Sequence, residues 1–382
     1  RHPNVQISQR ALVGIAFILH AYSPRIDFYP EINLRITALM EETAFEKELL
    51  RVHIQILLSQ ETEKIDKKMR EEIIPEMLKS MSPMRNMKFG FEESDEEKDD
   101  TNPDWADAIE KSGLGDKLRE MNELQLEGAD VYMSTFAQLK SYPFFREISN
   151  WFYPFDRQQS AVIKEFRNRE TEGGSLLEII LQSGFFCNSD KYSLFFTMQQ
   201  LPQSQRDMML SQLTEQQMEE LADQSKAETL KKFSERPDTV SNQYLHDLYR
   251  FFKLNMRRQE FHDLFKEAIC LYSNPALEDM LFNPDALLAL ANFHFRKEHW
   301  EKAAEAYDKV AYMVPRENEA EVYQKQGYSL QKLKRYAQAI EAYRKADTLK
   351  PNNLWTNRHL AICYRLDRQF RKALEYYRKV EG

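Results

Sequence analysis

Apolar residues near the start of the chain recur with the period of an α-helix. After a His2-Pro3-Asn4 opening they lie four positions apart: Ile7, Ala11, Ile15 and Leu19. Because a helix turns once every 3.6 residues, this spacing predicts an amphipathic helix that buries these four side chains. The periodicity resumes after a break at Ser23-Pro24 and predicts two or three helices over residues 32–81.

The helical pattern stops at a strongly acidic segment, residues 89–104. Between Phe91 and Asp104, eight acidic residues accompany a single basic one, Lys98. Like charges at this density oppose a packed fold, so the segment is expected to be a disordered loop. Helical spacing then returns and predicts a long helix from about Gly115 to Lys140.

Seven aromatic residues crowd the fourteen positions from Tyr142 to Phe155, where prolines forbid a continuous helix. Rings this dense are expected to pack in a core. The alternative is a fixed platform of rings that lines a pocket for an apolar or sugar ligand.

The last third of the chain repeats itself. Ala303, Ala339 and Ala373 lie 36 and 34 residues apart, and other residues recur in the same frame. The recurring positions are Leu287, Leu290, Ala291, Trp300, Tyr307 and Pro315, then Tyr323, Gly327, Tyr336, Tyr343, Ala346 and Pro351, then Leu360, Ala361, Tyr364, Phe370 and Tyr377. Small residues let paired helices touch, rings fill the space between them, and proline separates one pair from the next.

This pattern resembles the tetratricopeptide repeat (TPR) family over roughly residues 245–381, with a degenerate repeat before three clear ones. The first helix also resembles a HEAT or armadillo repeat, although Ser8 stands where HEAT repeats usually have arginine. The whole chain is similar to larger bacterial proteins with HEAT-like N-terminal helices and C-terminal TPRs. That group implies an architecture and no activity.

The expected fold is therefore all-α, an α-solenoid with HEAT-like N-terminal helices, a middle helical domain and C-terminal TPR hairpins. The expected domains are a HEAT/armadillo-like region at 1–88, the acidic loop at 89–104, a middle helical domain at 105–240 and the TPR array at 241–382.

In TPR arrays the first helix of each hairpin lines the concave groove. The register of this sequence assigns these residues to the groove: Asn292, Phe295, Arg296, Lys325, Tyr328, Lys332, Trp355, Arg358, His359 and Arg365. The set is basic and aromatic, so it predicts a protein or peptide partner with acidic groups and an apolar anchor. It does not match the TPR clamp for acidic chaperone C-termini, because only Asn292 agrees with that motif.

Charge narrows the choice of partner. The net charge of −8 and the pI near 5.7 argue against nucleic acid. Residues 316–382 carry 15 basic and 8 acidic residues, whereas residues 92–130 carry 15 acidic and 4 basic ones. The acidic loop 92–104 is therefore a second, intramolecular candidate for the groove, with an attraction limited by a Debye length of about 8 Å.

The remaining composition points to the cytoplasm. Cys187, Cys270 and Cys363 lie far apart without CxxC spacing, which argues against a disulfide framework or a zinc site and favours reduced thiols. The longest apolar run, residues 11–19, is too short to span a membrane, and no cofactor or metal is predicted. Because the chain begins at Arg1 in mid-pattern, we expect it to be part of a longer protein.

No catalytic motif stands out, because the sequence lacks a Walker loop, GxGxxG and GxSxG. His294 and His299, five apart, are predicted to point to different helix faces. The most enzyme-like stretch runs from Cys187 to Tyr192. Its simpler interpretation is that Asn188 or Ser189 caps a helix while Cys187 packs as a small buried residue.

These observations predict a non-enzymatic adaptor or assembly scaffold that binds its partner in the TPR groove. One alternative is a ligand-sensing regulator with a small-molecule pocket around Tyr142 to Phe155. Another is a structural scaffold whose groove packs against other parts of a longer chain.

Overall fold

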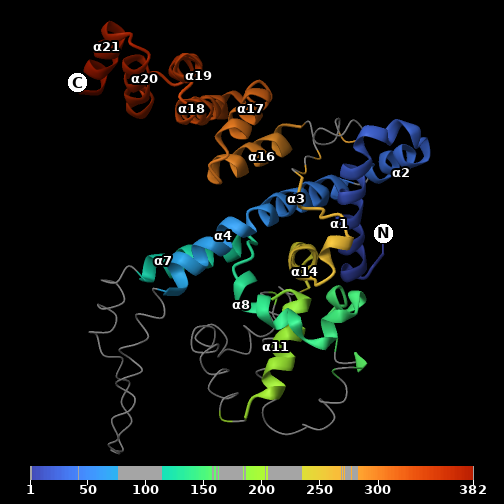
Figure 1. Ribbon diagram of the computed structural model, residues 1–382. Coiled ribbons are helices and arrows are strands. Elements are labelled where there is room, and N and C mark those ends of the chain that lie inside the picture. The colour runs from blue at the N-terminus through green and yellow to red at the C-terminus, as the bar shows by residue number, and fades with distance from the viewer. Residues whose placement is uncertain are drawn as a thin grey trace, which may run out of the picture. The chain divides into compact units, whose positions relative to one another are not determined.

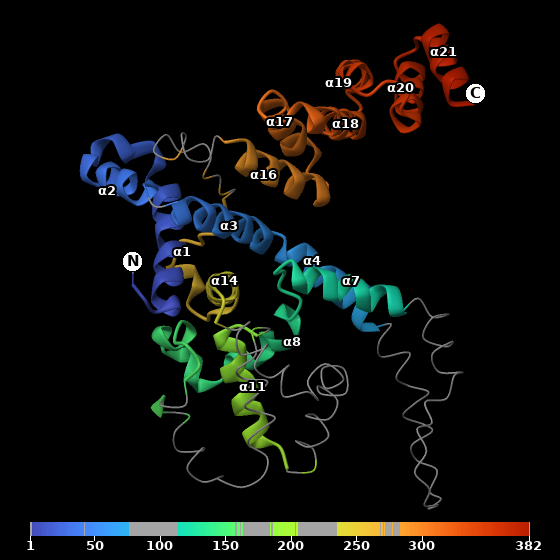
Figure 2. The same ribbon diagram turned by 180° about the vertical axis from the view of Figure 1, so that it is seen from behind.

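The computed structural model describes residues 2–41, 43–75, 114–156, 159–160, 162, 184, 186–202, 204, 235–267, 269, 271, 277 and 283–381. Every regular element of these residues is helical, which confirms the all-α prediction. Figures 1 and 2 show the labelled helices from opposite sides. None of the described helices is long and apolar enough to cross a membrane. The acidic loop 89–104 lies outside the described residues, as does the predicted contact between this loop and the groove.

Contacts divide the chain into two compact units. The first contains residues 1–18 and 51–269, and the second contains residues 19–50 and 270–382. The domain boundaries expected at 88, 104 and 240 stay predictions, because the first two border or lie within residues that are not described. The resemblance of the N-terminal helices to HEAT repeats also stays a prediction.

The first helix, α1 (Val5–Tyr22), buries a different face from the predicted one. Its buried apolar residues are Leu12, Val13, Ala16, Phe17 and Leu19. Ile7, in contrast, is 51% exposed, and Ala11 is exposed as well. The residues at 12–13 and 16–17 form a broader apolar stripe, and Phe17 packs edge-to-face on Phe265 at a ring separation of 5.4 Å. Of the predicted stripe only Leu19 is buried.

The helices expected over residues 32–81 are present as far as residue 75. They are α2 (Pro30–Met40), α3 (Thr43–Gln60), α4 (Thr62–Lys68) and a π-helical turn, η2 (Met69–Ile73), after the 3-10 turn η1 (Ser23–Phe28). Gln55 of α3 donates to the Asp238 carbonyl at 2.8 Å and accepts from Ser241 Oγ at 2.7 Å. These two bonds attach α3 to α14 (Pro237–Leu254).

The single helix predicted over residues 115–140 is divided into shorter elements. They are α7 (Leu114–Leu126), α8 (Met133–Ala137) and the 3-10 turn η3 (Gln138–Ser141). Gly128 interrupts them with a left-handed φ of 91°, a conformation that favours glycine. Its carbonyl accepts from Asn242 Nδ2 at 2.9 Å and from His246 Nε2 at 3.1 Å, so α14 anchors this turn.

Six of the seven rings between Tyr142 and Phe155 pack in the aromatic core of the first unit, whereas Tyr153 is 53% exposed. The turns η4 (Pro143–Arg146) and η5 (Ile148–Trp151) place them against α11 (Asn188–Gln200) and α14. Phe145 and Trp151 are 3% and 1% exposed, and their rings lie 5.0 Å apart. Trp151 Nε1 donates to the Phe145 carbonyl at 2.8 Å, so the indole is satisfied inside the core. This packing favours the core interpretation over a ligand pocket.

The second unit contains three helical hairpins, which appear in orange and red in Figure 1. They are α16 (Pro284–Arg296) with α17 (Trp300–Val310), α18 (Arg316–Lys332) with α19 (Tyr336–Leu349), and α20 (Leu354–Leu366) with α21 (Phe370–Glu381). Each hairpin turn has one left-handed residue at the same place: Glu298, Lys334 and Arg368, with φ of 60°, 60° and 61°. The predicted repeat is therefore present in the backbone as well as in the sequence.

Small residues lie where paired helices touch, as predicted. Ala291, Ala303, Ala339 and Ala361 are completely buried, and they belong to the packed interior of the hairpins. Tyr307 and Tyr343, also buried, occupy the clusters between helices. The close packing depends on this alternation of small and large side chains.

Gly327→Ala should destabilise the array by about 1–3 kcal/mol, because an added Cβ would lie 2.8 Å from two ring carbons of buried Tyr343. Gly14→Ala in α1 is the matched control, since a Cβ there meets nothing within 4 Å and should stabilise by up to about 1 kcal/mol. Urea unfolding followed by circular dichroism measures both. A Gly327→Ala protein as stable as the wild type would contradict the close approach.

The residues predicted to form a degenerate fourth hairpin take another conformation. Helix α14 corresponds to the expected first helix, but residues 261–267 form turns and not a second helix. Phe261 packs on Phe251 and Phe265 packs on Tyr249, each pair with rings 5.1 Å apart. Bulky rings at positions where the repeat needs small residues prevent close helix pairing, and they join the aromatic core of the first unit instead.

Candidate functional site

Five rings from the three hairpins form a continuous row, which we call the aromatic strip: Phe295, Trp300, Tyr328, Trp355 and His359. Phe295 lies 5.7 Å from Tyr328, and Trp300 lies 5.7 Å from the same ring. Tyr328 in turn lies 6.2 Å from Trp355 and 5.7 Å from His359. The strip therefore joins α16, α17, α18 and α20 through ring contacts of the usual aromatic spacing.

Four strip residues were assigned to the groove by sequence register, and Trp300 was missed. Trp300 begins α17, the second helix of its hairpin, which the register does not place in a groove. The left-handed turn at Glu298 brings it back beside Phe295, at a ring separation of 5.5 Å. The sequence signal that could have identified Trp300 is its position in the repeat, three residues before Ala303.

Lys332 covers the middle of the aromatic strip. Its Nζ lies 5.2 Å from the centroid of the Tyr328 ring and 5.9 Å from that of Trp300. An ammonium group over ring faces is attracted by their quadrupoles, and here the lysine is exposed to solvent as well. A positive charge is thus held beside apolar surface, which is the combination predicted for an acidic partner with an apolar anchor.

Asn292 and Lys325 are occupied by contacts within the array. Asn292 Oδ1 accepts from Lys325 Nζ at 3.0 Å and from Tyr307 Oη at 2.8 Å. Lys325 also pairs with Glu321 at 2.7 Å. These bonds tie α16 to α18 and compensate the lysine charge, so the two residues position the groove more than they contribute charge to it.

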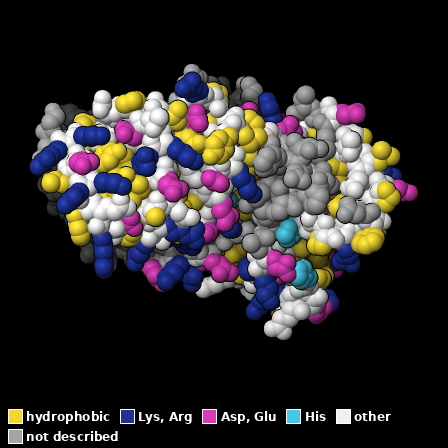
Figure 3. Space-filling view, turned by 90° about the horizontal axis from the view of Figure 1, so that it is seen from above, with side chains coloured by type: hydrophobic (Ala, Val, Ile, Leu, Met, Phe, Trp, Pro, Cys, Tyr) yellow, Lys and Arg dark blue, Asp and Glu magenta, His cyan; other side chains and the backbone are white. Residues whose placement is uncertain are grey.

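Three arginines of the predicted set lie on exposed surface: Arg296, Arg358 and Arg365. Figure 3 shows Lys and Arg side chains interspersed with hydrophobic ones over the C-terminal hairpins, on the left of the view. The array is therefore basic and partly apolar at its surface. This surface suits charge-assisted hydrogen bonds to carboxylates.

His359 packs against Trp355 in a tilted arrangement with ring centroids 4.0 Å apart, and the two form the end of the strip. Burial lowers the pKa of His359 to about 4, and the nearby charges of Arg358 and Lys332 act in the same direction. The imidazole is therefore neutral at pH 7, so it adds no positive charge to the groove, contrary to a simple count of basic residues.

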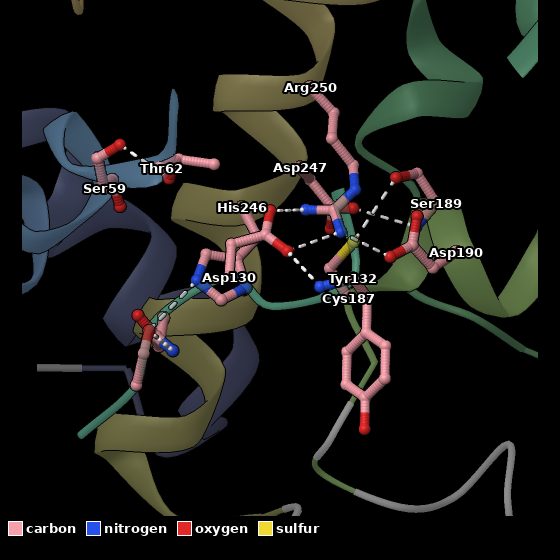
Figure 4. Close-up of polar contacts among 12 residues, drawn as sticks. Ser59, Thr62, Asp130, Tyr132, Cys187, Ser189, Asp190, His246, Asp247 and Arg250 are labelled. Atoms are coloured by element: carbon pink, nitrogen blue, oxygen red, sulfur yellow. Dashed lines mark hydrogen bonds and ion pairs between the residues drawn. The ribbon is translucent and has the colours of Figure 1, made fainter. Parts of the chain in front are cut away.

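The first unit holds a second candidate, a buried charge cluster made of Asp130, Lys140, Asp190 and Arg250. Arg250 Nη2 donates to Asp130 Oδ1 at 2.9 Å and to Asp190 Oδ2 at 2.6 Å, while Nη1 pairs with Asp130 Oδ2. Lys140 Nζ donates to Asp190 Oδ1 at 2.8 Å. All four side chains are at most 2% exposed. Figure 4 shows the Arg250 guanidinium between the two carboxylates.

The cluster joins elements that are distant in sequence. Arg250 comes from α14, Asp190 from α11, Lys140 from η3 and Asp130 from the segment before α8. The Arg250 charge and its hydrogen bonds outweigh the burial that would otherwise raise the pKa of Asp130, so that pKa is lowered. No sequence motif signals this arrangement, because the partners are 50 to 120 positions apart.

The cap of α11 differs from the predicted one. The helix begins at Asn188, yet the groups that accept its first N–H donors belong to Asp247 of α14. Asp247 Oδ1 accepts from Ser189 N at 2.8 Å, and Oδ2 accepts from Asn188 N at 3.2 Å. A carboxylate here also complements the positive end of the helix dipole. The predicted cap by Asn188 or Ser189 is therefore wrong, since a distant residue supplies it.

The enzyme-like stretch from Cys187 to Tyr192 is part of this core. Cys187 is 1% exposed, and burial raises the pKa of its thiol well above the ordinary value. A thiol held protonated is a poor nucleophile. The prediction that Cys187 packs as a small buried residue is confirmed, and the stretch has the character of a structural core.

The two histidines of the first hairpin do meet. His294 Nδ1 and His299 Nδ1 lie 3.3 Å apart, because the turn at Glu298 folds the chain back between them. The prediction that they point to different faces is wrong, since it treated the segment as one straight helix. Among the described residues no group of three or more His, Cys, Asp or Glu side chains could hold a metal ion.

A family model described as "Tetratricopeptide repeat" matches residues 320–353, which include most of α18 and all of α19. The second hairpin is therefore a tetratricopeptide repeat, as predicted from the sequence. Such repeats are protein-interaction modules, and a protein-interaction or scaffold role follows in these general terms. No curated protein sequence matches the chain.

Solved structures of MamA resemble the chain at low similarity. The structure titled "MamA MSR-1 C2" is 20% identical, covers 41% of this chain and 84% of its own, and has a TM-score of 0.28. A mutant form of MamA is 22% identical, covers 41% and 81% respectively, and has the same TM-score. At this TM-score the likeness carries no inference about activity or partners.

Proposed function

We propose that the chain is an adaptor or scaffold module that binds a peptide segment of a partner protein along the aromatic strip. The continuous strip with Lys332 above it is the observation that carries this proposal. Trp355, 42% exposed, offers a large apolar surface to a partner. Aromatic residues contribute most to binding where they anchor a desolvated contact.

The partner proposed for this site is a peptide with an apolar residue flanked by acidic ones. Lys332 precedes the Trp355–His359 pair in sequence, exposed Arg358 lies between the two residues of the pair, and both cations are positive. Carboxylates that approach these groups form charge-assisted bonds, while the apolar residue covers Trp355. The same charges attract acidic segments from solution, so salt should weaken the complex.

Selection of a random 12-residue peptide display library on the whole chain tests this proposal. Recovered peptides should share acidic residues around an aromatic or aliphatic one. In fluorescence anisotropy, Trp355→Ala combined with Lys332→Glu should weaken their binding at least tenfold, since an anchor and a charge are both lost. Raising the salt concentration should weaken binding to the wild type.

A matched control changes another aromatic residue and another lysine elsewhere in the array. Tyr312→Ala combined with Lys345→Glu removes an exposed ring and the lysine that lies 5.5 Å from it, outside the aromatic strip. This variant should bind the selected peptides like the wild type. If both variants lose the same affinity for the peptides, or if both stay folded and keep the same affinity, the aromatic strip is not the binding site.

One observation favours the structural-scaffold alternative as a second candidate. Phe370 and Leu374 of α21 are 64% and 52% exposed. The residues at the place of Leu374 in the earlier hairpins, Ala304 and Ile340, are both 6% exposed. The outer face of α21 can therefore take another helix, as α17 and α19 do. Failure of the library to yield strip-binding peptides would favour this alternative.

A further inference from the structure

The protonation state of His359 follows from its neighbours in the array. Its Nδ1 lies 2.9 Å from Gln331 Oε1, and the same oxygen accepts from Tyr343 Oη at 3.0 Å. A carbonyl oxygen has lone pairs and no hydrogen, so both neighbours must donate to it. Because the ring is neutral at pH 7, its single proton is on Nδ1, and Nε2 carries a lone pair.

The Nε2 atom of His359 is available to a ligand. Among the described residues this atom has no hydrogen-bond partner. It is not a buried atom either, so it is open to solvent. The ring cannot turn freely, because the rings of Trp355 and Tyr343 pack against it with centroids 4.0 Å and 5.7 Å away. The lone pair therefore keeps one direction.

We propose that His359 is a specificity-determining residue that accepts a hydrogen bond from the bound peptide, and that the peptide places a donor, not an acidic group, at this position. The proposal rests on the proposed function of the aromatic strip. It follows from the Gln331 contact, which fixes the acceptor, and from the Trp355 contact, which fixes its direction.

The proposal divides the site into two chemically different parts. Carboxylates of the partner pair with Lys332 and Arg358, whereas a carboxylate or phosphate facing His359 Nε2 would set lone pair against lone pair. The donor is a backbone N–H, a hydroxyl or an amide. A partner whose acidic residues form an unbroken run without a donor at this position is discriminated against, although the groove is basic.

The tautomer can be measured without any ligand. Long-range proton–nitrogen correlation spectra of the whole chain with nitrogen-15-labelled histidine, at pH 7, should show a protonated Nδ1 and a bare Nε2 for His359. His359→Gln assigns the signals. Gln331→Leu should abolish the preference for this tautomer, and Gln331→Glu, which keeps an acceptor oxygen, should retain it. A protonated Nε2 at pH 7 would overturn the proposal.

Binding of the peptides selected from the 12-residue library provides the second test. His359→Phe keeps a ring that packs against Trp355 and loses the acceptor, so it should weaken binding about tenfold. His359→Gln keeps an acceptor and should recover most of the lost affinity. Methylating backbone nitrogens one at a time, and replacing hydroxyl or amide side chains by alanine, should identify one donor. Removal of this donor should weaken peptide binding to the wild type about tenfold. It should not weaken binding to His359→Phe any further.

Failure of this inference differs from failure of the proposed function. Peptides that bind the wild type, lose affinity in Trp355→Ala with Lys332→Glu, and bind His359→Phe unchanged would overturn the role of His359 and leave the strip as the binding site. A library that yields no strip-binding peptide would overturn both, even with the expected tautomer.

Discussion

Arg250→Met should destabilise the chain by about 3–5 kcal/mol, because it leaves buried carboxylates without their cation. Among the described residues, Asp130 loses its only ion-pair partner, and Asp190 keeps only Lys140. Methionine fills much of the volume of the arginine stem, so the loss of stability comes mainly from the missing charge and less from a cavity. The free energy of unfolding in urea at pH 7 measures the effect.

The matched control for this variant is Arg257→Met, at an arginine just after the same helix. Arg257 pairs with Glu260 at 2.5 Å, and the two side chains are 59% and 54% exposed. Because solvent screens exposed pairs, this substitution should change stability far less than Arg250→Met does. Similar effects for the two variants would show that the buried cluster does not stabilise the fold.

The effect of Arg250→Met should also depend on pH. In the wild type the pKa of Asp130 is lowered, so its contribution to stability is present above its unfolded pKa, near 4, and is lost as the pH falls through the folded value. Without Arg250, burial dominates and raises that pKa. The stability difference between the two proteins should therefore shrink on acidification, and a difference independent of pH would contradict the role of Asp130.

Lys191→Met should stabilise the chain at pH 7 by up to about 3 kcal/mol. Lys191 is 5% exposed, and burial lowers its pKa from 10.5 to about 8, against the opposing pull of Asp247. Below pH 8 the ammonium group is charged in both states, and the folded state carries the cost of its burial. Methionine keeps the apolar stem without that cost.

The sign of this effect can be followed by titration. Between pH 8 and about 10.5 the unfolded chain holds a proton on Lys191 that the folded chain has released, so wild-type stability should gain with rising pH from this group. The advantage of Lys191→Met should therefore decline towards zero across this window. Burial also raises the pKa values of Tyr192 and Tyr249, but both proteins share these groups and the difference cancels them.

Lys64→Met is the control for the lysine titration, because the Lys64 side chain is 72% exposed and loses little hydration on folding. At pH 7 the Lys64→Met protein should therefore lack the stabilisation that is expected of Lys191→Met. A Lys191→Met protein that is less stable than the wild type at pH 7 would contradict the account, since it would mean that the attraction to Asp247 outweighs burial.

The hairpins of the second unit were predictable from sequence because their contacts are local. Each small residue packs against a helix no more than one repeat away, so a period of 36 and 34 residues at Ala303, Ala339 and Ala373 is enough to indicate the arrangement. The groove register placed Phe295, Tyr328, Trp355 and His359 on first helices for the same reason. It missed Trp300, which only the turn at Glu298 brings beside Phe295.

The first helix shows how periodicity alone can select the wrong face. Ile7, Ala11 and Ile15 have helical spacing, but so do the apolar residues at 12–13 and 16–17 on the other side. Which stripe is buried depends on what packs against it, and Phe265, far along the chain, contacts Phe17. The sequence could indicate a helix here, and only the tertiary contacts select its buried side.

By itself the sequence determined that this chain is helical, that its last third is a repeat array, and that the array presents rings and positive charges. Only the tertiary structure decided which charges are neutralised. Arg250 reaches Asp130 across 120 positions, Asp247 caps a helix that begins 59 positions earlier, and the surroundings of His359 remove its charge. Burial and pairing set the state of a titratable group, and both arise from residues that meet only when the chain is folded.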